Sequence, residues 1–153
     1  MRIEPISKAD LHIIEEWLSD EKLLNLTKTE KPDFTRPMII YVAKIDSVPV
    51  GTLELFNIDM DNYKAEFGLS FPGRRGVAGI ATKMFLRKAF KEWCFNRIYV
   101  RPLAINKHAI SNAKRLGFKQ EGIERQVIYK DGQYLDIVVL SLLREEYIER
   151  WDR

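Results

Sequence analysis

The sequence predicts a single α+β domain, an α/β-type three-layer arrangement in which helices flank a mixed, mostly antiparallel central sheet. Its 153 residues suffice for one domain with a sizeable core but leave little room for a second. Short β-rich runs alternate with amphipathic helical segments along the chain. Asp131-Gly132, a strong hairpin turn signal, separates two β-rich runs near the end. We therefore expect one domain over residues 1–153, with the element order β-α-(α)-β-β-β-α-β-α-β-β.

The first half of the chain predicts a strand, a helix and then three more strands. A short strand over Arg2–Ile6 comes first, and Ser7 and Asp10 follow with the spacing of the N-cap and N3 residues of a helix. Asp46-Ser47 separates two β-rich runs and predicts a hairpin, which a third run extends into an antiparallel meander. The three strands are expected at residues 38–45, 48–58 and 63–71.

The second half predicts two helices, a strand between them and a terminal hairpin. Ala81, Phe85, Ala89 and Trp93 recur every four residues, which is typical of an amphipathic helix on a sheet. A second helix is expected to start near Lys107 and to end before the C-terminal glycine Gly117. The strands are expected at residues 97–101, 118–129 and 133–143, and a short helix closes the chain.

Composition limits the function classes that the chain can serve. With 46% hydrophobic and 31% charged residues, it is typical of a globular protein. Its 25 basic and 22 acidic residues give a net charge of +3, too small an excess to indicate nucleic acid. No apolar run approaches the roughly 20 residues of a membrane helix, and no secretory leader is recognisable. We expect a cytoplasmic protein without a membrane or nucleic-acid partner.

Cysteine and histidine usage gives no sign of a disulfide framework or a metal. Cys94 is the only cysteine, and we expect it to be a small buried hydrophobic residue rather than a nucleophile. His12 and His108 are isolated, whereas a zinc site needs three or four clustered ligands. We therefore expect no metal.

The run from Arg74 to Thr82 predicts a phosphate-binding loop. Several small residues before a helix let the chain approach an anion closely, and the first helical N–H groups are free to donate to it. The spacing excludes both a P-loop and the dinucleotide-binding fingerprint. The alternative is a glycine-rich turn that only caps an ordinary helix.

Two spaced motifs resemble those of the GNAT superfamily of acetyl-CoA-dependent N-acetyltransferases. The second half of the family's first motif is matched by Gly79-Ile80-Ala81. The family's second motif is similar to two runs that follow, Asn106-Lys107-His108-Ala109-Ile110 and Lys114-Arg115-Leu116-Gly117-Phe118. Glu66-Phe67-Gly68, Glu121-Gly122 with Arg125, and the run from Asp131 to Asp136 look most like the branch that contains the ribosomal-protein N-terminal acetyltransferases. The resemblance covers nearly the whole chain.

The resemblance implies acetyl-CoA as co-substrate, with its pyrophosphate on the backbone amides of the loop and its pantetheine arm beside the preceding strand. A backbone N–H near Leu69 would then stabilise the oxyanion. Asn106 would contact the cofactor arm, and its position also suits a helix N-cap, so we expect both roles. The expected cofactor-binding residues are Leu69, Ser70, Phe71, Arg74, Arg75, Gly76, Val77, Ala78, Gly79, Ile80, Ala81, Thr82, Asn106 and Ser111.

Three positions depart from the family pattern. Gly76 stands where the family has Gln or Arg, although Arg75 is adjacent. Ala113 stands where many members carry the tyrosine that protonates the departing thiolate, and Ala109 stands where the ribosomal branch often has serine. The proton for the sulfur would then come from Ser111, from a tyrosine of the terminal hairpin, or from water.

Two residues are catalytic candidates. An alkyl amine has a pKa of about 10.4, so a base must help to remove its proton before it can attack a thioester. Glu66 matches the position of a glutamate that the family uses directly or through water; the alternative is a strand-end glutamate in solvent. Tyr134 could reach the site as an acid or a substrate contact, but we favour a cross-strand aromatic pair with Tyr129.

These observations predict acetyl transfer to a primary amine, by direct attack in a ternary complex. The acceptor could be a protein N-terminus, an amino-sugar or a small amine, bound by residues 19–36 and 124–135. One alternative is a CoA-binding sensor or interaction module without chemistry, which Ala109 and Ala113 would favour. A basic nucleic-acid-binding domain is a third, weaker alternative, based on the lysine-rich helix. The edge of the terminal hairpin could pair two subunits in a homodimer.

Overall fold

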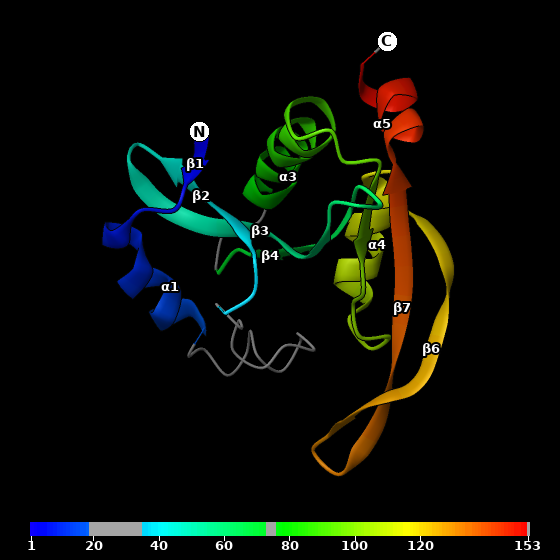
Figure 1. Ribbon diagram of the computed structural model, residues 1–153. Helices are drawn as coiled ribbons and strands as arrows, with labels where there is room; N and C mark the ends of the chain where they lie inside the picture. Colours follow the sequence, from blue (N-terminus) through cyan, green and yellow to red (C-terminus); the bar gives the residue numbers. More distant parts are fainter. Residues whose placement is uncertain (19–34, 73–75, 153) are drawn as a thin grey trace.

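A seven-stranded mixed sheet with flanking helices forms the molecule (Figure 1). The computed structural model describes residues 1–18, 35–72 and 76–152. The strands are β1 (Arg2–Pro5), β2 (Ile39–Ile45), β3 (Val48–Asp59), β4 (Lys64–Ser70), β5 (Arg97–Val100), β6 (Lys119–Lys130) and β7 (Gln133–Leu143). The helices are the 3₁₀ turn η1 (Lys8–Asp10), α1 (Leu11–Leu18), α3 (Val77–Arg87), the π-helical turn η2 (Lys88–Glu92), α4 (Lys107–Arg115) and α5 (Arg144–Trp151).

The strand order across the sheet is β1-β2-β3-β4-β5-β7-β6, and only the β4–β5 pair is parallel. This confirms the predicted α+β class with its mostly antiparallel sheet. The predicted element order is also found, except that the second early helix would fall within residues 19–34, outside the described residues. No helix in the described parts of the chain is long and apolar enough to cross a membrane.

Both predicted hairpin turns are confirmed by their backbone conformation. Asp46 and Ser47 have φ values of 49° and 67°, and Asp131 and Gly132 have φ values of 51° and 77°. Two consecutive residues with positive φ form the type I′ turn, whose twist matches that of the flanking strands.

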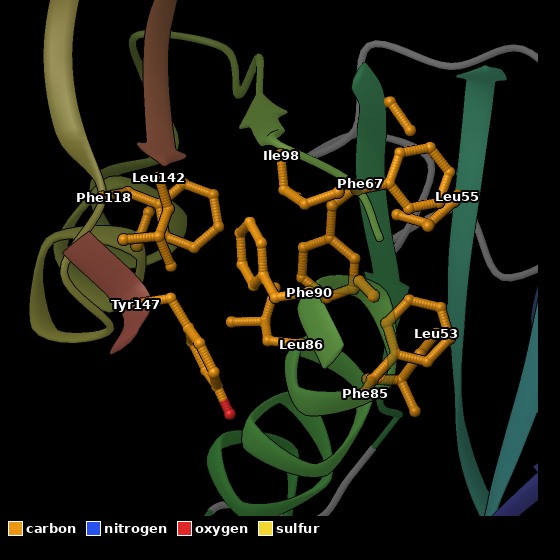
Figure 2. Packing of buried hydrophobic residues seen from close by; sticks show 14 of the residues in the cluster. Leu53, Leu55, Phe67, Phe85, Leu86, Phe90, Ile98, Phe118, Leu142 and Tyr147 are labelled. Atoms are coloured by element: carbon orange, nitrogen blue, oxygen red, sulfur yellow. The ribbon is translucent and has the colours of Figure 1, made fainter. Parts of the chain in front are cut away.

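The core lies between α3 and one face of the sheet. The ring of Phe85 packs 5.6 Å from that of Tyr41 and 5.7 Å from that of Phe67, measured between ring centroids. Figure 2 shows Phe67 and Phe85 beside the buried Leu53 and Leu55. Because side chains alternate along a strand, the residues between these, including Glu54 and Glu66, lie on the opposite face of the sheet.

The helix that follows the loop ends differently from the prediction. Its α-helical part stops at Arg87, and a π-helical turn over Lys88–Glu92 follows, with the Trp93 N–H donating to the Lys88 carbonyl at 2.9 Å. Cys94 comes next with a φ of 59° and is exposed, so the expectation that it is buried is wrong. Its left-handed backbone places it in the turn after the helix rather than on the apolar face.

Candidate active site

The parallel strands β4 and β5 are paired over only part of their length. Their register runs from Lys64↔Arg97 to Glu66↔Tyr99 and ends there. Beyond Glu66, β4 continues to Ser70 while paired with β3. The backbone of residues 67–70 therefore has an edge toward β5 that lies outside the ladder. Such an edge offers N–H and C=O groups to an added extended chain.

The start of α3 lies close to this edge in the chain. Gly76 is the N-cap residue, with a φ of 89° that glycine adopts without strain, and α3 begins at Val77, seven residues after β4 ends. The first N–H groups of a helix have no partner within it, and they lie at the positive end of its dipole. A Cβ atom added at Gly79 would meet nothing within 4 Å, and Ile80 is 58% exposed. This helix start is therefore open to a ligand.

The predicted loop residues fall into an outer and an inner group. Gly76, Gly79 and Ile80 are exposed at the helix start, with Val77 and Ala78 half-buried beside them. Ala81 and Thr82 are buried, and the Thr82 hydroxyl donates to the Ala78 carbonyl at 2.7 Å, so these two side chains point into the protein. Arg74 and Arg75 lie outside the described residues. In the preceding strand and its end, Leu69 is exposed, while Ser70 and Phe71 are half-buried.

The start of α4 lies at the same edge of the sheet as the start of α3. The carboxyl ends of parallel strands meet at one edge, and α3 and α4 follow the parallel strands β4 and β5. The Asn106 side chain accepts a hydrogen bond from the Ala109 N–H at 3.0 Å, which confirms the predicted N-cap. Further along α4, Ser111 is exposed and Ala113 is buried in the core.

A buried polar cluster lies on the sheet face opposite α3. Glu66 is only 1% exposed, so the alternative of a glutamate in solvent is wrong. Its Oε2 atom accepts a hydrogen bond from Asn57 Nδ2 at 2.9 Å and lies 3.9 Å from Arg101 Nη1. Arg101 also donates from Nε to Glu124 Oε1 at 3.2 Å. Asn57 of β3 and Arg101, which follows β5, thus fix the Glu66 carboxylate of β4, and Glu124 of β6 holds Arg101 in place.

Burial raises the pKa of two groups in this region, Tyr99 and Glu54. Burial raises the pKa of Tyr99, which pairs with Glu66 across β5 and β4, and the nearby Glu66 carboxylate adds to this effect. Burial also raises the pKa of Glu54 to about 7. The Glu54 side chain keeps some exposure, but protein atoms surround it closely enough to disfavour its charged form.

Tyr134, the second catalytic candidate, lies away from this cluster. It is 65% exposed, and its ring lies 4.9 Å from that of Tyr129, its register partner on β6. This confirms the cross-strand aromatic pair. The pairing of β7 with β5 begins six residues later, at Leu140, which corresponds to about 20 Å along the strand. The structure therefore does not bring Tyr134 and Glu66 together within one chain, and a catalytic role of Tyr134 stays a prediction.

Sequence reasoning missed Asn57, Arg101 and Glu54. Asn57 has a φ of 49° at a bulge in β3, and only the register of the sheet shows that it faces Glu66. Glu54 carried a signal, because a lone carboxylate between two strand leucines must lie on the face opposite them. Among the described residues, no group of three or more His, Cys, Asp or Glu side chains could hold a metal ion.

The chain is similar in sequence and in fold to proteins named N-acetyltransferases. No protein-family model matches the chain. It is 33% identical over 101 residues to YdaF of Bacillus subtilis, a ribosomal-type N-acetyltransferase by name, covering 63% of this chain and 55% of YdaF. It is 27% identical over 135 residues to the prophage-derived N-acetyltransferase YokL of the same organism, covering 86% and 70% of the two chains. The chain thus spans little more than half the length of YdaF.

The spermidine N-acetyltransferase of Vibrio cholerae, solved in complex with CoA and spermine, has the same fold. It superposes with a TM-score of 0.88 over 96% of this chain and 97% of its own, at 18% sequence identity.

Proposed function

We propose that this chain is a member of the GNAT superfamily and that it transfers an acetyl group from acetyl-CoA to a primary amine. The observation that carries the proposal is the parting of β4 and β5 beside the open start of α3. It supplies a free strand edge and a helix N-terminus at one edge of the sheet, in a chain whose curated relatives are named N-acetyltransferases.

The residues at this edge fit the chemistry of acetyl-CoA. The backbone N–H groups from Gly76 to Ile80 suit the pyrophosphate, and the open space at Gly79 lets it approach. The strand edge over residues 67–70 suits the amides of the pantetheine arm, and Asn106 lies at the same end of the sheet. When bound, acetyl-CoA supplies an activated acetyl thioester.

The polar cluster supplies the groups that act on the acceptor. An alkylammonium ion must lose a proton before its nitrogen can attack, and a buried carboxylate attracts it. Glu66, fixed by Asn57 and Arg101, is proposed to hold the acceptor's nitrogen by its charge. The attack is direct, in a ternary complex, and Ser111 or water protonates the departing sulfur because Ala113 carries no hydroxyl.

The acceptor is proposed to be a cationic primary amine. YdaF is named for ribosomal N-acetylation, and the Vibrio cholerae enzyme was solved with spermine, so protein N-termini and small polyamines are the first acceptors to test. Amino-sugars are the third class. The carboxylates of Glu54 and Glu66 on one sheet face favour a positively charged acceptor over a neutral one.

Thiol release tests this function. The protein is incubated with acetyl-CoA and each acceptor class, released CoA is measured, and the acetylated acceptor is identified by mass spectrometry. We expect release that depends on the acceptor for at least one class. Release that depends on no acceptor, from protein shown by circular dichroism to be folded, would contradict the proposal.

A CoA-binding module without chemistry is the second candidate. Ala113 is buried where the family's tyrosine would stand, and Tyr134 is distant from Glu66 within the chain. CoA binding measured by calorimetry, without turnover on the whole acceptor panel, would favour this candidate. A clear drop in turnover for Glu66→Gln would argue against it.

We also propose a homodimer through the outer edge of β6. Within the described sheet β6 has a single neighbour, β7, and it exposes Ile123 and Val127. A free strand edge with exposed apolar side chains can pair with a second copy.

A further inference from the structure

The buried face opposite α3 holds a second carboxyl group, Glu54, to which the sequence motifs assign no role. In the register of the sheet, Glu54 lies between Ile40 on β2 and Gly68 on β4. Glu66 lies two residues before Gly68 on the same face, so it is a diagonal neighbour of Glu54. The α-carbons of such diagonal neighbours on adjacent strands are about 7 Å apart.

The Glu54 side chain lies over the backbone of β4. A Cβ atom added at Gly68 would be 2.7 Å from Glu54 Oε1, 3.0 Å from Glu54 Cγ and 3.0 Å from Phe56 Cε1. The carboxyl group therefore occupies the space that a side chain at Gly68 would fill. Gly68 belongs to the segment of β4 whose pairing with β5 has ended. The carboxyl thus lies beside the edge that the proposed function assigns to the pantetheine arm.

The two carboxyl groups differ in their partners. Glu66 is held by Asn57 and Arg101. Glu54, by contrast, makes no hydrogen bond or ion pair within the described part of the chain. Burial raises its pKa to about 7, so both its charged and neutral forms are populated near neutral pH. A general base works best in this range.

The neighbouring elements present few titratable groups to Glu54. β2 contributes Ile40 opposite it, and β4 contributes Gly68 opposite it and Glu66 beyond. Further across the sheet on this face are Tyr99 of β5 and Arg101, which is already bonded to Glu124. Burial alone accounts for the raised pKa of Glu54, and no charged neighbour among the described residues contributes to it.

From this placement we propose that Glu54 accepts the proton of the acceptor amine, while Glu66 holds the amine by its charge. The inference rests on the proposed function and names a catalytic residue for the same site. The acceptor enters as an ammonium ion, and the Glu54 carboxylate takes one proton from it and becomes a carboxylic acid. The nitrogen lone pair then forms the N–C bond to the acetyl carbon as the C–S bond breaks. The second nitrogen proton reaches the departing thiolate through Ser111 or water, and Glu54 releases its proton to solvent.

The first experiment compares Glu54→Gln with its matched control Glu66→Gln, using the acceptor that the panel identifies. For Glu54→Gln we expect kcat to fall roughly 100-fold with an unchanged KM for acetyl-CoA, because general-base catalysis contributes on this order. The rise of kcat with pH near 7 should disappear in Glu54→Gln and persist in Glu66→Gln. The proposal is overturned if Glu54→Gln keeps the wild-type rate and pH profile, or if Glu66→Gln alone removes the rise.

The second experiment does not depend on turnover. The ¹³C signals of the glutamate carboxyl groups are followed by NMR from pH 4 to pH 9, and Glu54 is assigned by the signal that Glu54→Gln lacks. We expect a titration midpoint near 7 and a shifted signal when acetyl-CoA is added. A midpoint at the ordinary value of 4.5, or no response to acetyl-CoA, contradicts the role. Absent turnover in the wild type would contradict the proposed function instead, and this titration would still report on Glu54.

A third variant, Gly68→Ala, moves the carboxyl without removing it. The added methyl group would stand where Glu54 Oε1 now lies, and the flexible glutamate must swing away. We expect kcat to fall about 10-fold, because the displaced carboxyl loses part of the general-base contribution. The double variant Gly68→Ala/Glu54→Gln should be no slower than Glu54→Gln alone, because both changes act on the same group. Full kcat in Gly68→Ala, or a further loss in the double variant, contradicts the proposal.

Discussion

Two glycines at the start of α3 serve different purposes. Gly76 has a φ of 89°, so any other residue there is strained even though space is available. Gly79 lies within the helix with ordinary backbone angles and open space around it, so the fold itself does not require glycine at this position. Under the proposed function, Gly79 leaves room for the pyrophosphate to approach the helix N–H groups.

Gly79→Trp should weaken CoA binding more than tenfold and leave the fold intact. The indole would stand in the open space beside the helix N–H groups, while replacing a helical glycine costs no contact and gains up to about 1 kcal/mol of helix propensity. Calorimetry with CoA and a thermal melt measure the two effects. Gly79→Ala is the control, with equal or higher stability and a much smaller loss of affinity. Unchanged CoA affinity in Gly79→Trp would refute the assignment of the loop.

Glu54→Gln should stabilise the protein at alkaline pH. The pKa of Glu54 is about 7 in the folded protein against an ordinary 4.5, so the folded state binds more protons between these values and wild-type stability falls as pH rises through them. The glutamine variant lacks this fall and should be more stable at pH 8, by up to about 3 kcal/mol. Urea unfolding at pH 5 and pH 8 measures the difference. A variant that is less stable than wild type at pH 8 would show that the Glu54 carboxylate has a favourable partner.

Among the elements, β5 connects the two halves of the sheet, and Arg97 at its start and Arg101 just after its end form ion pairs with β6. Arg97 donates from Nη2 to Glu121 Oε2 at 2.7 Å, and the Ser141 hydroxyl of β7 donates to Glu121 Oε1 at 2.6 Å. These hydrogen bonds lower the pKa of Glu121 to about 2, and the one from Arg97 has the largest effect. Arg101 makes the corresponding pair with Glu124. The second half of the sheet is thereby fixed to the strand that borders the candidate site.

Arg97→Gln should reduce stability at neutral pH but not in acid. Because the folded pKa of Glu121 lies below its ordinary 4.5, the stabilisation is complete above pH 4.5 and is lost as pH falls toward 2. The Glu121 side chain is 43% exposed, so solvent screening limits the loss at pH 7 to about 1 kcal/mol. Urea unfolding of both proteins at pH 7 and pH 2.5 provides the test. A difference that persists unchanged at pH 2.5 would mean that Arg97 stabilises through packing instead.

At the scale of the whole molecule, the long β6–β7 hairpin extends past the rest of the sheet (Figure 1). Tyr129 and Tyr134 pair near its turn, and Ile123 and Val127 lie along its outer strand. In an isolated chain these side chains contact water. The proposed homodimer would cover them.

Ile123→Lys should shift the protein from dimer to monomer. A lysine on the free edge of a strand opposes pairing with a second copy. Light scattering after size-exclusion chromatography measures the mass, and Lys130→Arg, at the turn of the hairpin, serves as control. A wild-type protein that is monomeric at every concentration would contradict the dimer.

Local signals in the sequence predicted much of this structure. The two hairpin turns, the Asn106 cap and the helix after the glycine-rich loop each depend on residues within a few positions of one another. The predicted four-residue spacing of buried apolar residues is also found, because Ala81 and Phe85 of α3 and Ala89 of η2 are all buried. Arg74, Arg75 and much of the expected acceptor pocket lie outside the described residues.

The sequence by itself determined the order and type of the elements, since turn, cap and periodicity signals act over a few residues. The tertiary structure alone decided which groups meet. Asn57, Glu66 and Arg101 come from three places in the chain and are brought together by strand register, which a shift of one residue would reverse. The same register places Glu54 over Gly68 and leaves Tyr134 about 20 Å along β7 from the β5 pairing. Burial on the face of the sheet opposite α3 raises the pKa of Glu54 above that of an ordinary glutamate. This burial depends on packing between residues far apart in the chain.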